Sequence, residues 1–313
     1  MDVFLTFDDG IQAGTEEVLA VLKEEGVKAT FFLAGIQLSY SYKKDYKNCL
    51  RLLKDVYDNH VIGNHSYSHA NYEFSEYYDK DGVIVDNKQN RRSIFEDFGK
   101  NKNLINELIK LIYNREVPDT KTLLSKNQKT PLARLPGRNS WYLSIPTADT
   151  QLSNSLAFFV RCEKGTERIS EQLFENGYQV FGWNAEWNMS FEFHQDAVFL
   201  KREKKASCLY DYNKGEHTHL DFDMYSKDNL LKDRLTESYT DFLEKLLKSA
   251  VYDKSILLMH DRAFRRSATW QSNPENSNDK NYPVDTSQAN KLKSLIVQLK
   301  KLNVKFKTLD NYF

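Results

Sequence analysis

The chain of 313 residues has few cysteines, no excess of charge and no long apolar run. Its three cysteines, Cys49, Cys162 and Cys208, are widely separated and odd in number, which argues against a disulfide framework or a paired-cysteine metal site. The 44 basic and 44 acidic residues cancel, so no overall positive field draws the protein to nucleic acid. No stretch approaches the roughly 18 to 20 apolar residues of a membrane-spanning helix, and the first residues lack the pattern of a signal peptide. We therefore expect no nucleic-acid partner and no transmembrane segment, whereas the oligomeric state stays open.

The apolar content is high enough for a folded core, because 40% of the residues are hydrophobic and 13% are aromatic. Segments with the apolar pattern of strands alternate with amphipathic segments of helical period. The expected strands are 2–7, 27–33, 60–63, 133–135, 178–183, 255–259 and 304–309, and the expected helices are 15–25, 44–59, 101–113, 166–176, 230–249 and 287–302. This alternation predicts one α/β domain over residues 1–313, with a parallel sheet or barrel.

Three segments interrupt the alternation: 72–100, 188–228 and 265–286. We interpret them as loop insertions, and long ordered loops often carry substrate contacts. The first contains an aromatic cluster made of Tyr72, Phe74, Tyr77 and Tyr78, which would either stack on sugars or pack against the body of the protein. In the second, His217 and His219 could form a further metal site, but solvated loop histidines are the more usual explanation.

Polar groups follow nearly every expected strand, and the carboxyl ends of parallel strands meet on one face of the fold. Asp8 and Asp9 follow the first strand. Successive side chains of an extended strand face opposite sides, so the chain must bend before Gly10 if both carboxylates are to face one site. The alternative is that one of them caps the helix that begins near Thr15.

His65 and His69 are four residues apart, which on a helical turn would put both imidazoles on one face. On a strand the same spacing would separate them by roughly 13 Å, too far for one cation. The small polar residues around them favour a turn that opens into a helix. With Asp9 they would form a three-ligand site with an open position, the type that hydrolytic Zn²⁺ uses, although cobalt, nickel or manganese suits the same ligands.

Five segments in order resemble the five motifs of the polysaccharide deacetylases of the NodB-homology, carbohydrate esterase family 4 type. The segments are Thr6-Phe7-Asp8-Asp9-Gly10, His65-Ser66-Tyr67-Ser68-His69, Arg134-Leu135-Pro136-Gly137-Arg138, Trp183-Asn184-Ala185-Glu186-Trp187 and Leu257-Leu258-Met259-His260-Asp261. The resemblance implies a distorted (β/α) barrel, commonly with seven strands, that removes N-acetyl groups from amino sugars of a glycan and uses one divalent metal, with Zn²⁺ favoured. It also favours an exported or cell-envelope setting.

The resemblance also implies a role for each matching residue. It gives Asp8 as the catalytic base, with Arg134 as the partner that keeps Asp8 ionised, and His260 as the acid, with Glu186 as the carboxylate that raises the pKa of His260. The backbone of Gly137 is the donor to the oxyanion. The metal ligands are Asp9, His65 and His69, and the substrate-binding residues are Leu258, Trp183, Trp187, Arg138 and Trp141. Two departures stand out: Leu135 and Gly137 change the third motif, and Glu186 replaces an aspartate.

Two other functions compete with deacetylation. A mononuclear metallo-phosphoesterase uses similar Asp and His ligands, but it needs cations for the phosphate, for which the candidates are Arg138 and the cluster that begins at Arg262. A non-catalytic carbohydrate-binding module would keep the fold, but it has no need of both Asp8 and His260. The sequence does not identify the glycan.

Overall fold

The computed structural model describes most of the chain, including all the segments that carry the motifs. The described residues are 1–69, 83–85, 91–114, 130–145, 157–189, 210–211, 216–217, 235, 237–250, 253–264 and 287–313. The aromatic cluster at 72–78 and the expected insertion 265–286 lie outside the described residues, as do Cys208 and His219.

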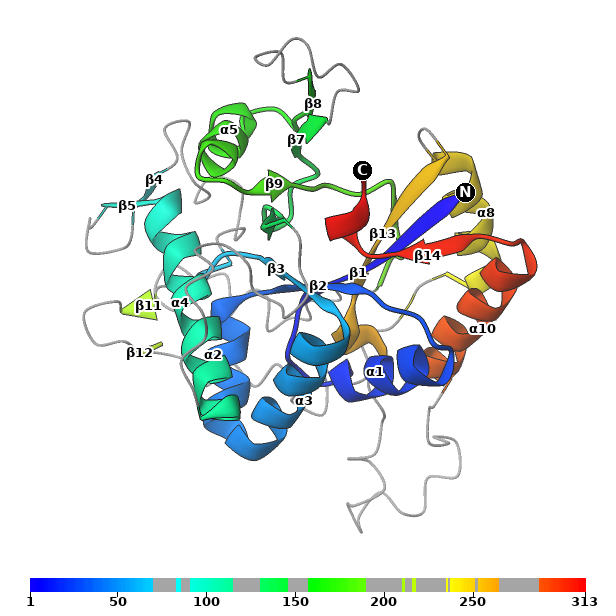
Figure 1. Cartoon of the computed structure of the whole chain (residues 1–313), viewed down its shortest axis with the longest axis horizontal. Helices are drawn as coiled ribbons and strands as arrows, with labels where there is room; N and C mark the ends of the chain where they lie inside the picture. Colours follow the sequence, from blue (N-terminus) through cyan, green and yellow to red (C-terminus); the bar gives the residue numbers. More distant parts are fainter. Residues whose placement is uncertain are drawn as a thin grey trace, which may run out of the picture.

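One curled sheet of ten strands forms the framework, with helices along its outer side (Figure 1). Seven successive strands in it are parallel: β10 (Ala185–Glu186), β13 (Lys254–His260), β1 (Asp2–Asp9), β2 (Thr30–Leu33), β3 (Val61–Asn64), β6 (Leu132–Ala133) and β9 (Gln179–Val180). An eighth, β14 (Lys305–Lys307), pairs in parallel with the beginning of β1. The predicted α/β fold with a distorted barrel is therefore confirmed, although the strand count of seven is not.

The remaining strands are antiparallel and extend the sheet at one edge. β7 (Trp141–Ile145) pairs with β9 and with β8 (Ala157–Arg161). Two small separate hairpins join β4 (Val83–Val85) to β5 (Arg91–Ser93) and β11 (Tyr210–Asp211) to β12 (Glu216–His217). The sequence analysis did not predict the β7–β8 hairpin.

The helices follow one another around the outside of the sheet in the order α8, α10, α1, α3, α4, α5, each in contact with the next (Figure 1). Their bounds are α1 (Thr15–Glu24), α2 (Gly35–Lys44), α3 (Tyr46–Asn59), α4 (Ile94–Tyr113), α5 (Glu167–Glu175), α8 (Tyr239–Ser249) and α10 (Ser287–Lys301), with short 3-10 helices η1 (Asp261–Phe264) and η3 (Leu309–Asn311). None of the described helices is long and apolar enough to span a membrane.

Helix boundaries differ from the sequence expectation where capping residues decide them. α4 begins at Ile94, seven residues before the predicted start, because Ser93 and Glu96 form a reciprocal capping box. The first residues of α4 therefore belong to the framework and not to the insertion expected over 72–100. Similarly, α8 begins after Ser238, whose hydroxyl accepts a hydrogen bond from the Asp241 backbone, so the helix does not reach back to residue 230.

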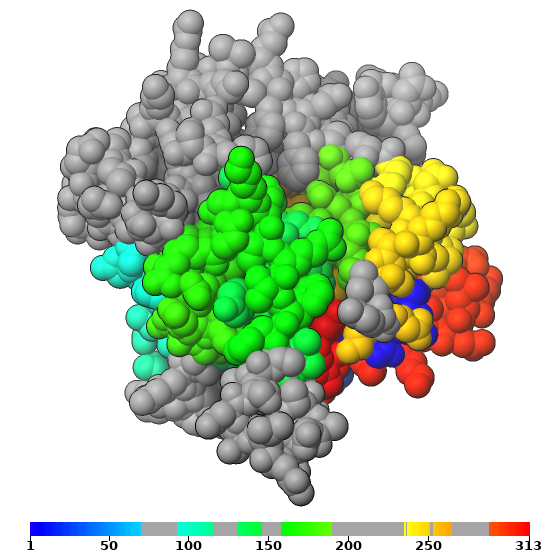
Figure 2. Space-filling model, turned by 90° about the horizontal axis from the view of Figure 1, so that it is seen from above, coloured from blue at the N-terminus to red at the C-terminus, as the bar shows by residue number. Residues whose placement is uncertain are grey.

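The two faces of β1 pack into different parts of the core. Val3, Leu5 and Phe7 face the layer of helices, whereas Phe4 faces the inside of the curled sheet, where it packs near the rings of Phe32, Trp141 and Phe181. Because side chains alternate along a strand, Thr6 and Asp8 share the inner face with Phe4. The two ends of the chain also lie close together, since β14 pairs with β1 (Figure 2).

Candidate metal centre and active site

Two adjacent carboxylates at the end of β1 face the same centre. Asp8 continues the inner face of the strand, and Asp9 would face the opposite side if the backbone stayed extended. Instead, Asp9 has φ 76°, in the left-handed region that non-glycine residues rarely adopt. This turn brings its carboxylate back beside that of Asp8, and both side chains are buried, with 3% and 6% of the residue surface exposed. The bend predicted before Gly10 is present.

The two histidines follow β3 in a tight turn and not in a helix. Residues 65–69 contain two non-glycine residues with positive φ, Ser66 at 64° and His69 at 50°. The helical turn that would put both imidazoles on one face is therefore not formed over residues 65–69, since left-handed backbone interrupts a right-handed helix, and the residues that would continue it lie outside the described part of the chain. The turn still brings the imidazoles together, with ring centroids 5.1 Å apart.

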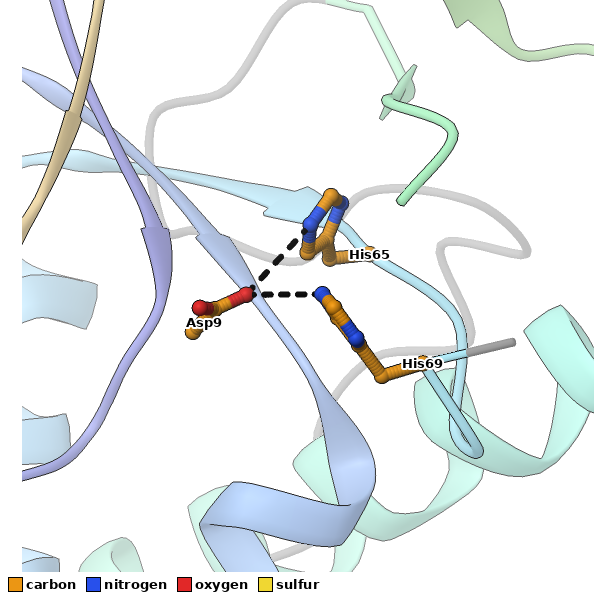
Figure 3. Close-up of side chains that lie close together, drawn as sticks. All are labelled: Asp9, His65 and His69. Atoms are coloured by element: carbon orange, nitrogen blue, oxygen red, sulfur yellow. Dashed lines mark ion pairs between the residues drawn. The ribbon is translucent and has the colours of Figure 1, made fainter. Parts of the chain in front are cut away.

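Asp9, His65 and His69 converge on one point (Figure 3). The Oδ1 atom of Asp9 lies 2.9 Å from Nε2 of His69 and 3.6 Å from Nε2 of His65. All three candidate ligand atoms lie within 4.8 Å of one another. A cation bound to nitrogen and oxygen at 2.0 to 2.2 Å separates its ligand atoms by a comparable distance, so this group could hold one metal ion.

The hydrogen bonding of His65 fits a metal at this point. Its Nδ1 lies 2.9 Å from the backbone oxygen of Arg134, which can only accept, so Nδ1 carries the proton. Burial lowers the pKa of His65 to about 3, and the ring is neutral at pH 7. Its Nε2 lone pair then faces oxygen lone pairs of Asp8 and Asp9 at 3.5 and 3.6 Å. Facing lone pairs repel one another unless a cation lies between them. A backbone carbonyl that accepts a hydrogen bond from the other ring nitrogen is typical of metal-bound histidine.

Arg134 joins Asp8 to the adjoining strands. The guanidinium is fully buried and donates from Nη1 to Oδ1 of Asp8 at 2.8 Å and to Oγ1 of Thr6 at 2.7 Å. It also donates to the backbone oxygens of Phe181 at 3.1 Å and Gly182 at 2.9 Å. Arg134 thus fixes one oxygen of Asp8, as the resemblance implied, while Oδ2 faces His65.

The two carboxylates have pKa values shifted in opposite directions. Burial raises the pKa of Asp8, and the attraction of Arg134 offsets only part of that rise, so the expectation that Arg134 keeps this pKa low does not hold for the net shift. For Asp9, burial acts in the same direction, but the neighbouring His69 and Arg262 outweigh it and hold the pKa well below its usual range. A proton at this site therefore goes to Asp8 before Asp9.

His260 ends β13 directly beside Asp8, its register partner on β1. Its Nε2 lies 4.0 Å from Oδ2 of Asp9. Burial lowers the pKa of His260 to about 4, with Asp9 and Asp8 as the carboxylates that oppose the shift. This corrects the expectation that Glu186 raises the pKa of His260, because in the folded chain desolvation of the imidazole is the larger effect.

Glu186 lies on the neighbouring strand, β10, in register with Leu258. Its side chain is partly buried, and burial followed by the charge of Asp8 raises the pKa of its carboxyl group. Leu258 is buried, with 4% exposed, two residues before His260 on the same face of β13. Gly137 lies in the exposed turn after β6 and has φ 60°, a conformation that suits glycine.

Four residues that were expected to contact substrate pack against or pair with other side chains of the protein. Trp141 is 2% exposed and packs against Phe159 and Phe181, and Trp187 is 1% exposed and stacks on Phe242 with ring centroids 4.8 Å apart. The Arg138 guanidinium is paired with Glu163 at 2.8 Å. Trp183 is partly buried, with its ring 5.8 Å from the Arg134 guanidinium. The structure does not place Trp141 or Trp187 on a surface that a glycan could reach.

One residue at the centre was missed by the sequence analysis. Nη1 of Arg262, on η1, lies 3.3 Å from Oδ2 of Asp9, and its side chain is 16% exposed. The sequence had grouped Arg262 with a basic cluster for phosphate. Its position two residues after His260 was the available signal, because a residue that close to a strand end shares the same edge of the sheet.

Comparisons with known proteins agree with the motifs. Residues 1–110 match the family model of polysaccharide deacetylase. The chain is 26% identical to a chitin disaccharide deacetylase of Vibrio alginolyticus over 202 residues, which are 59% of this chain and 47% of the relative. It is 42% identical to a peptidoglycan-N-acetylglucosamine deacetylase of Bacillus cereus over 71 residues, 22% of this chain and 23% of the relative. These matches thus span half or less of the curated relatives' lengths.

Among solved structures, a CE4 esterase of Streptococcus mutans aligns with 98% of this chain and 84% of its own, at 21% identity and a TM-score of 0.48. The family model covers Asp8, Asp9, His65 and His69, and the tertiary structure adds Arg134 and His260 to them. The match makes residues 1–110, less than half of the chain, similar to the polysaccharide deacetylase family, and the motifs and the named relatives agree with that likeness.

Proposed function

We propose that this protein is a metal-dependent hydrolase that removes N-acetyl groups from amino sugars of a glycan and releases acetate. One observation carries the proposal: a three-ligand group, a carboxylate with a raised pKa and an imidazole meet at one edge of the sheet. Relatives that act on chitin disaccharide and on peptidoglycan N-acetylglucosamine support an acetylated amino sugar as the substrate class.

Asp9, His65 and His69 would hold the metal through Oδ1 and the two Nε2 atoms, and Zn²⁺ suits one carboxylate and two neutral imidazoles. A divalent cation there would act as a Lewis acid toward the amide carbonyl and the attacking water. The Nδ1 proton of His65, donated to the Arg134 backbone oxygen, keeps the Nε2 lone pair directed at the centre.

Asp8 would accept the proton of the attacking water. Arg134 occupies its Oδ1, so Oδ2, which faces the ligand group at 3.5 Å from His65, is the atom that receives the proton. A base works best when its pKa lies near the working pH, and burial moves the pKa of Asp8 in that direction. Arg134 fixes the orientation of the carboxylate, and its charge limits how far burial raises the pKa.

His260 would give a proton to the departing amine. The carbon–nitrogen bond breaks as the amine receives a proton that His260 has taken up from the solvent, and Asp8 afterwards returns its own proton to the solvent. Because the resting pKa of His260 is about 4, the imidazole is neutral at pH 7, and its proton affinity has to rise during the reaction. Negative charge that develops on the substrate oxygen beside it has that effect. The backbone N–H of Gly137 would donate to that oxygen, and Leu258 would line the acetyl pocket.

Assays of acetate release from N-acetylglucosamine oligomers test the proposal, with and without a chelator. We expect release that stops with the chelator, returns with Zn²⁺ and is absent in His65→Ala, which should also lose bound metal. Hydrolysis of a phosphate monoester in place of acetate release would support the metallo-phosphoesterase. One of the two candidate phosphate-binding groups of that enzyme, Arg138, forms an ion pair with Glu163. Glycan binding without either product would indicate a non-catalytic module.

A further inference from the structure

Helix α4 has two buried polar residues on a face that is otherwise apolar. Asp97 and Asn101 are four residues apart, so they lie on the same side of the helix, and both are 0% exposed. Their neighbours on the buried face include Ile94, Phe98 and Ile105. A carboxylate in such a place is costly unless hydrogen bonds satisfy it, so its partners indicate what it does.

Two groups of one residue in the turn that carries the histidines donate hydrogen bonds to Asp97. The backbone N–H of Ser68 donates to Oδ1 at 3.1 Å, and its hydroxyl donates to Oδ2 at 2.8 Å. Ser68 immediately precedes His69. The carboxylate of Asp97 therefore holds the backbone at the point where the chain enters His69.

The turn needs such support, because its conformation is unfavourable on its own. Ser66 and His69 both have left-handed backbone angles, which are unfavourable for residues other than glycine. Two other hydrogen bonds stabilise the turn: Ser66 N–H donates to Oδ1 of Asn64 at 3.1 Å, and His69 N–H donates to the Ser66 hydroxyl at 3.0 Å. Strained backbone of this kind persists only where its surroundings fix it.

The two histidines of the turn differ in how their rings are held. His65 is 1% exposed, and its own Nδ1 is bonded to the Arg134 backbone oxygen. The His69 side chain is 27% exposed, and within the described part of the chain its ring meets Asp9 and His65, the other two members of the ligand group. The direction of the His69 ring therefore depends strongly on its backbone.

We propose that Asp97 is a positioning residue for the metal centre, which holds the 66–69 turn so that Nε2 of His69 faces Oδ1 of Asp9. The inference rests on the metal site of the proposed function, but not on the substrate or the reaction. It assigns a role in metal affinity to a residue of α4 that touches neither metal nor substrate.

Titration of the purified full chain with Zn²⁺ in competition with a chromophoric chelator tests this directly. Loss of an outer-shell partner typically lowers metal affinity 10- to 100-fold, so we expect a loss of that size in Asp97→Ala. Asp97→Asn keeps an oxygen for the Ser68 N–H and an amide beside the Ser68 hydroxyl, and it should recover most of the affinity. Ile105→Val, which alters the buried face of α4 away from the turn, should bind as the wild type does.

The visible spectrum of bound Co²⁺ gives a second readout that a purely structural role would not move. Asp97→Ala should change its band positions or intensities, whereas Ile105→Val should not. If Asp97→Ala fails to fold, Ser68→Ala serves instead, because it removes one of the two donors and should weaken binding several-fold.

Equal Zn²⁺ affinities in wild type, Asp97→Ala and Ser68→Ala would overturn the inference alone. A wild type that binds no metal would overturn it together with the metal site. Affinity that depends on Asp97 in a protein that releases no acetate would support the inference while the proposed deacetylation fails.

Discussion

Two neighbouring regions of the molecule use similar residue types in different ways. The first, which we call the centre, consists of Asp8, Asp9, His65, His69, Arg134 and His260. The second, which we call the rim, follows β6 and consists of Arg138, Trp141 and Glu163. In the centre, Asp8, Asp9, His65 and Arg134 are buried, and the three candidate metal ligands converge on one point. In the rim, the arginine and the glutamate pair with each other, and the tryptophan packs into the core.

The difference shows which observation distinguishes a reactive group from a structural one. Arg134 and Arg138 are four residues apart, and each donates to a carboxylate at 2.8 Å. Asp8 is 4% exposed at the side chain and lies beside the candidate ligand His65, whereas Glu163 is 41% exposed and pairs with Arg138. Distance alone therefore does not identify a functional pair. A functional pair is identified by its burial and by other titratable groups beside it.

The largest expected effect is on the chemistry of the centre. Asp8→Asn removes the proton acceptor but keeps the shape of the side chain, so we expect a loss on the order of 10²- to 10⁴-fold in the rate of acetate release. Zn²⁺ content and thermal stability should stay near the wild-type values, since Asp8 lies outside the proposed ligand set. Turnover at the wild-type rate would show that another group takes the proton.

Arg134→Met should produce the largest loss of stability. The substitution leaves Asp8 and the backbone oxygens of Phe181 and Gly182 buried without their donor. Breaking a buried pair by removing one partner costs about 3–5 kcal/mol in the free energy of unfolding, which urea denaturation measures. A loss below about 1 kcal/mol would remove the distinction between the centre and the rim.

Lowering the pH should decrease the free energy of unfolding through residues of the centre and not through residues of the rim. Burial lowers the pKa of His65 to about 3 and of His260 to about 4, whereas an unfolded histidine titrates near 6.5. Between about pH 6.5 and 4 the unfolded chain binds more protons than the folded chain. The free energy of unfolding therefore decreases as the pH is lowered, by up to about 1.4 kcal/mol per pH unit for each group. In the metal-free protein, His260→Gln should flatten this slope.

The control for the pH series is Arg138→Met, which should leave the slope as it is. His60, whose pKa burial lowers to about 4, contributes equally to the slope in every variant. A slope that His260→Gln leaves unchanged would mean that the His260 imidazole takes up its proton in the folded state as easily as in the unfolded chain.

The smallest expected effect is on the ion pair of the rim. Arg138→Met breaks the bond to Glu163, whose side chain is 41% exposed, and pairs in contact with solvent contribute about 0.2–1 kcal/mol. The free energy of unfolding measured in urea should therefore change by no more than this amount, and metal affinity should not change. A loss as large as that of Arg134→Met would indicate that the rim supports the centre.

Much of the fold was predictable because the apolar pattern of the main strands is local. β1, β13 and α1 occur where the sequence predicts them, since each has a continuous or periodic apolar pattern. The start of α4 and the β7–β8 hairpin were missed. The start of α4 depends on the capping residues Ser93 and Glu96, and the hairpin depends on pairing of β7 with β9, which the pattern within either strand does not reveal.

The candidate site was predictable as a set of residues but not as an arrangement. The residues of the centre follow from their places at strand ends and from the motifs, whereas Arg262 beside them was not predicted. The direction of each pKa shift did not follow, because desolvation depends on how deeply the fold buries His260 and Asp8. The hydrogen bonds from Ser68 to Asp97 could not be predicted either, since these two residues are not neighbours in the sequence.

The sequence by itself determined the alternation of strands and helices and the residue types at the strand ends, because both are properties of short segments. The tertiary structure decided which of those residues meet, as with Asp8, which pairs with an arginine 126 positions away. It also decided that Trp141 and Trp187 are core residues. The physical reason is that burial, charge coupling and backbone strain arise only when separate segments share one interior.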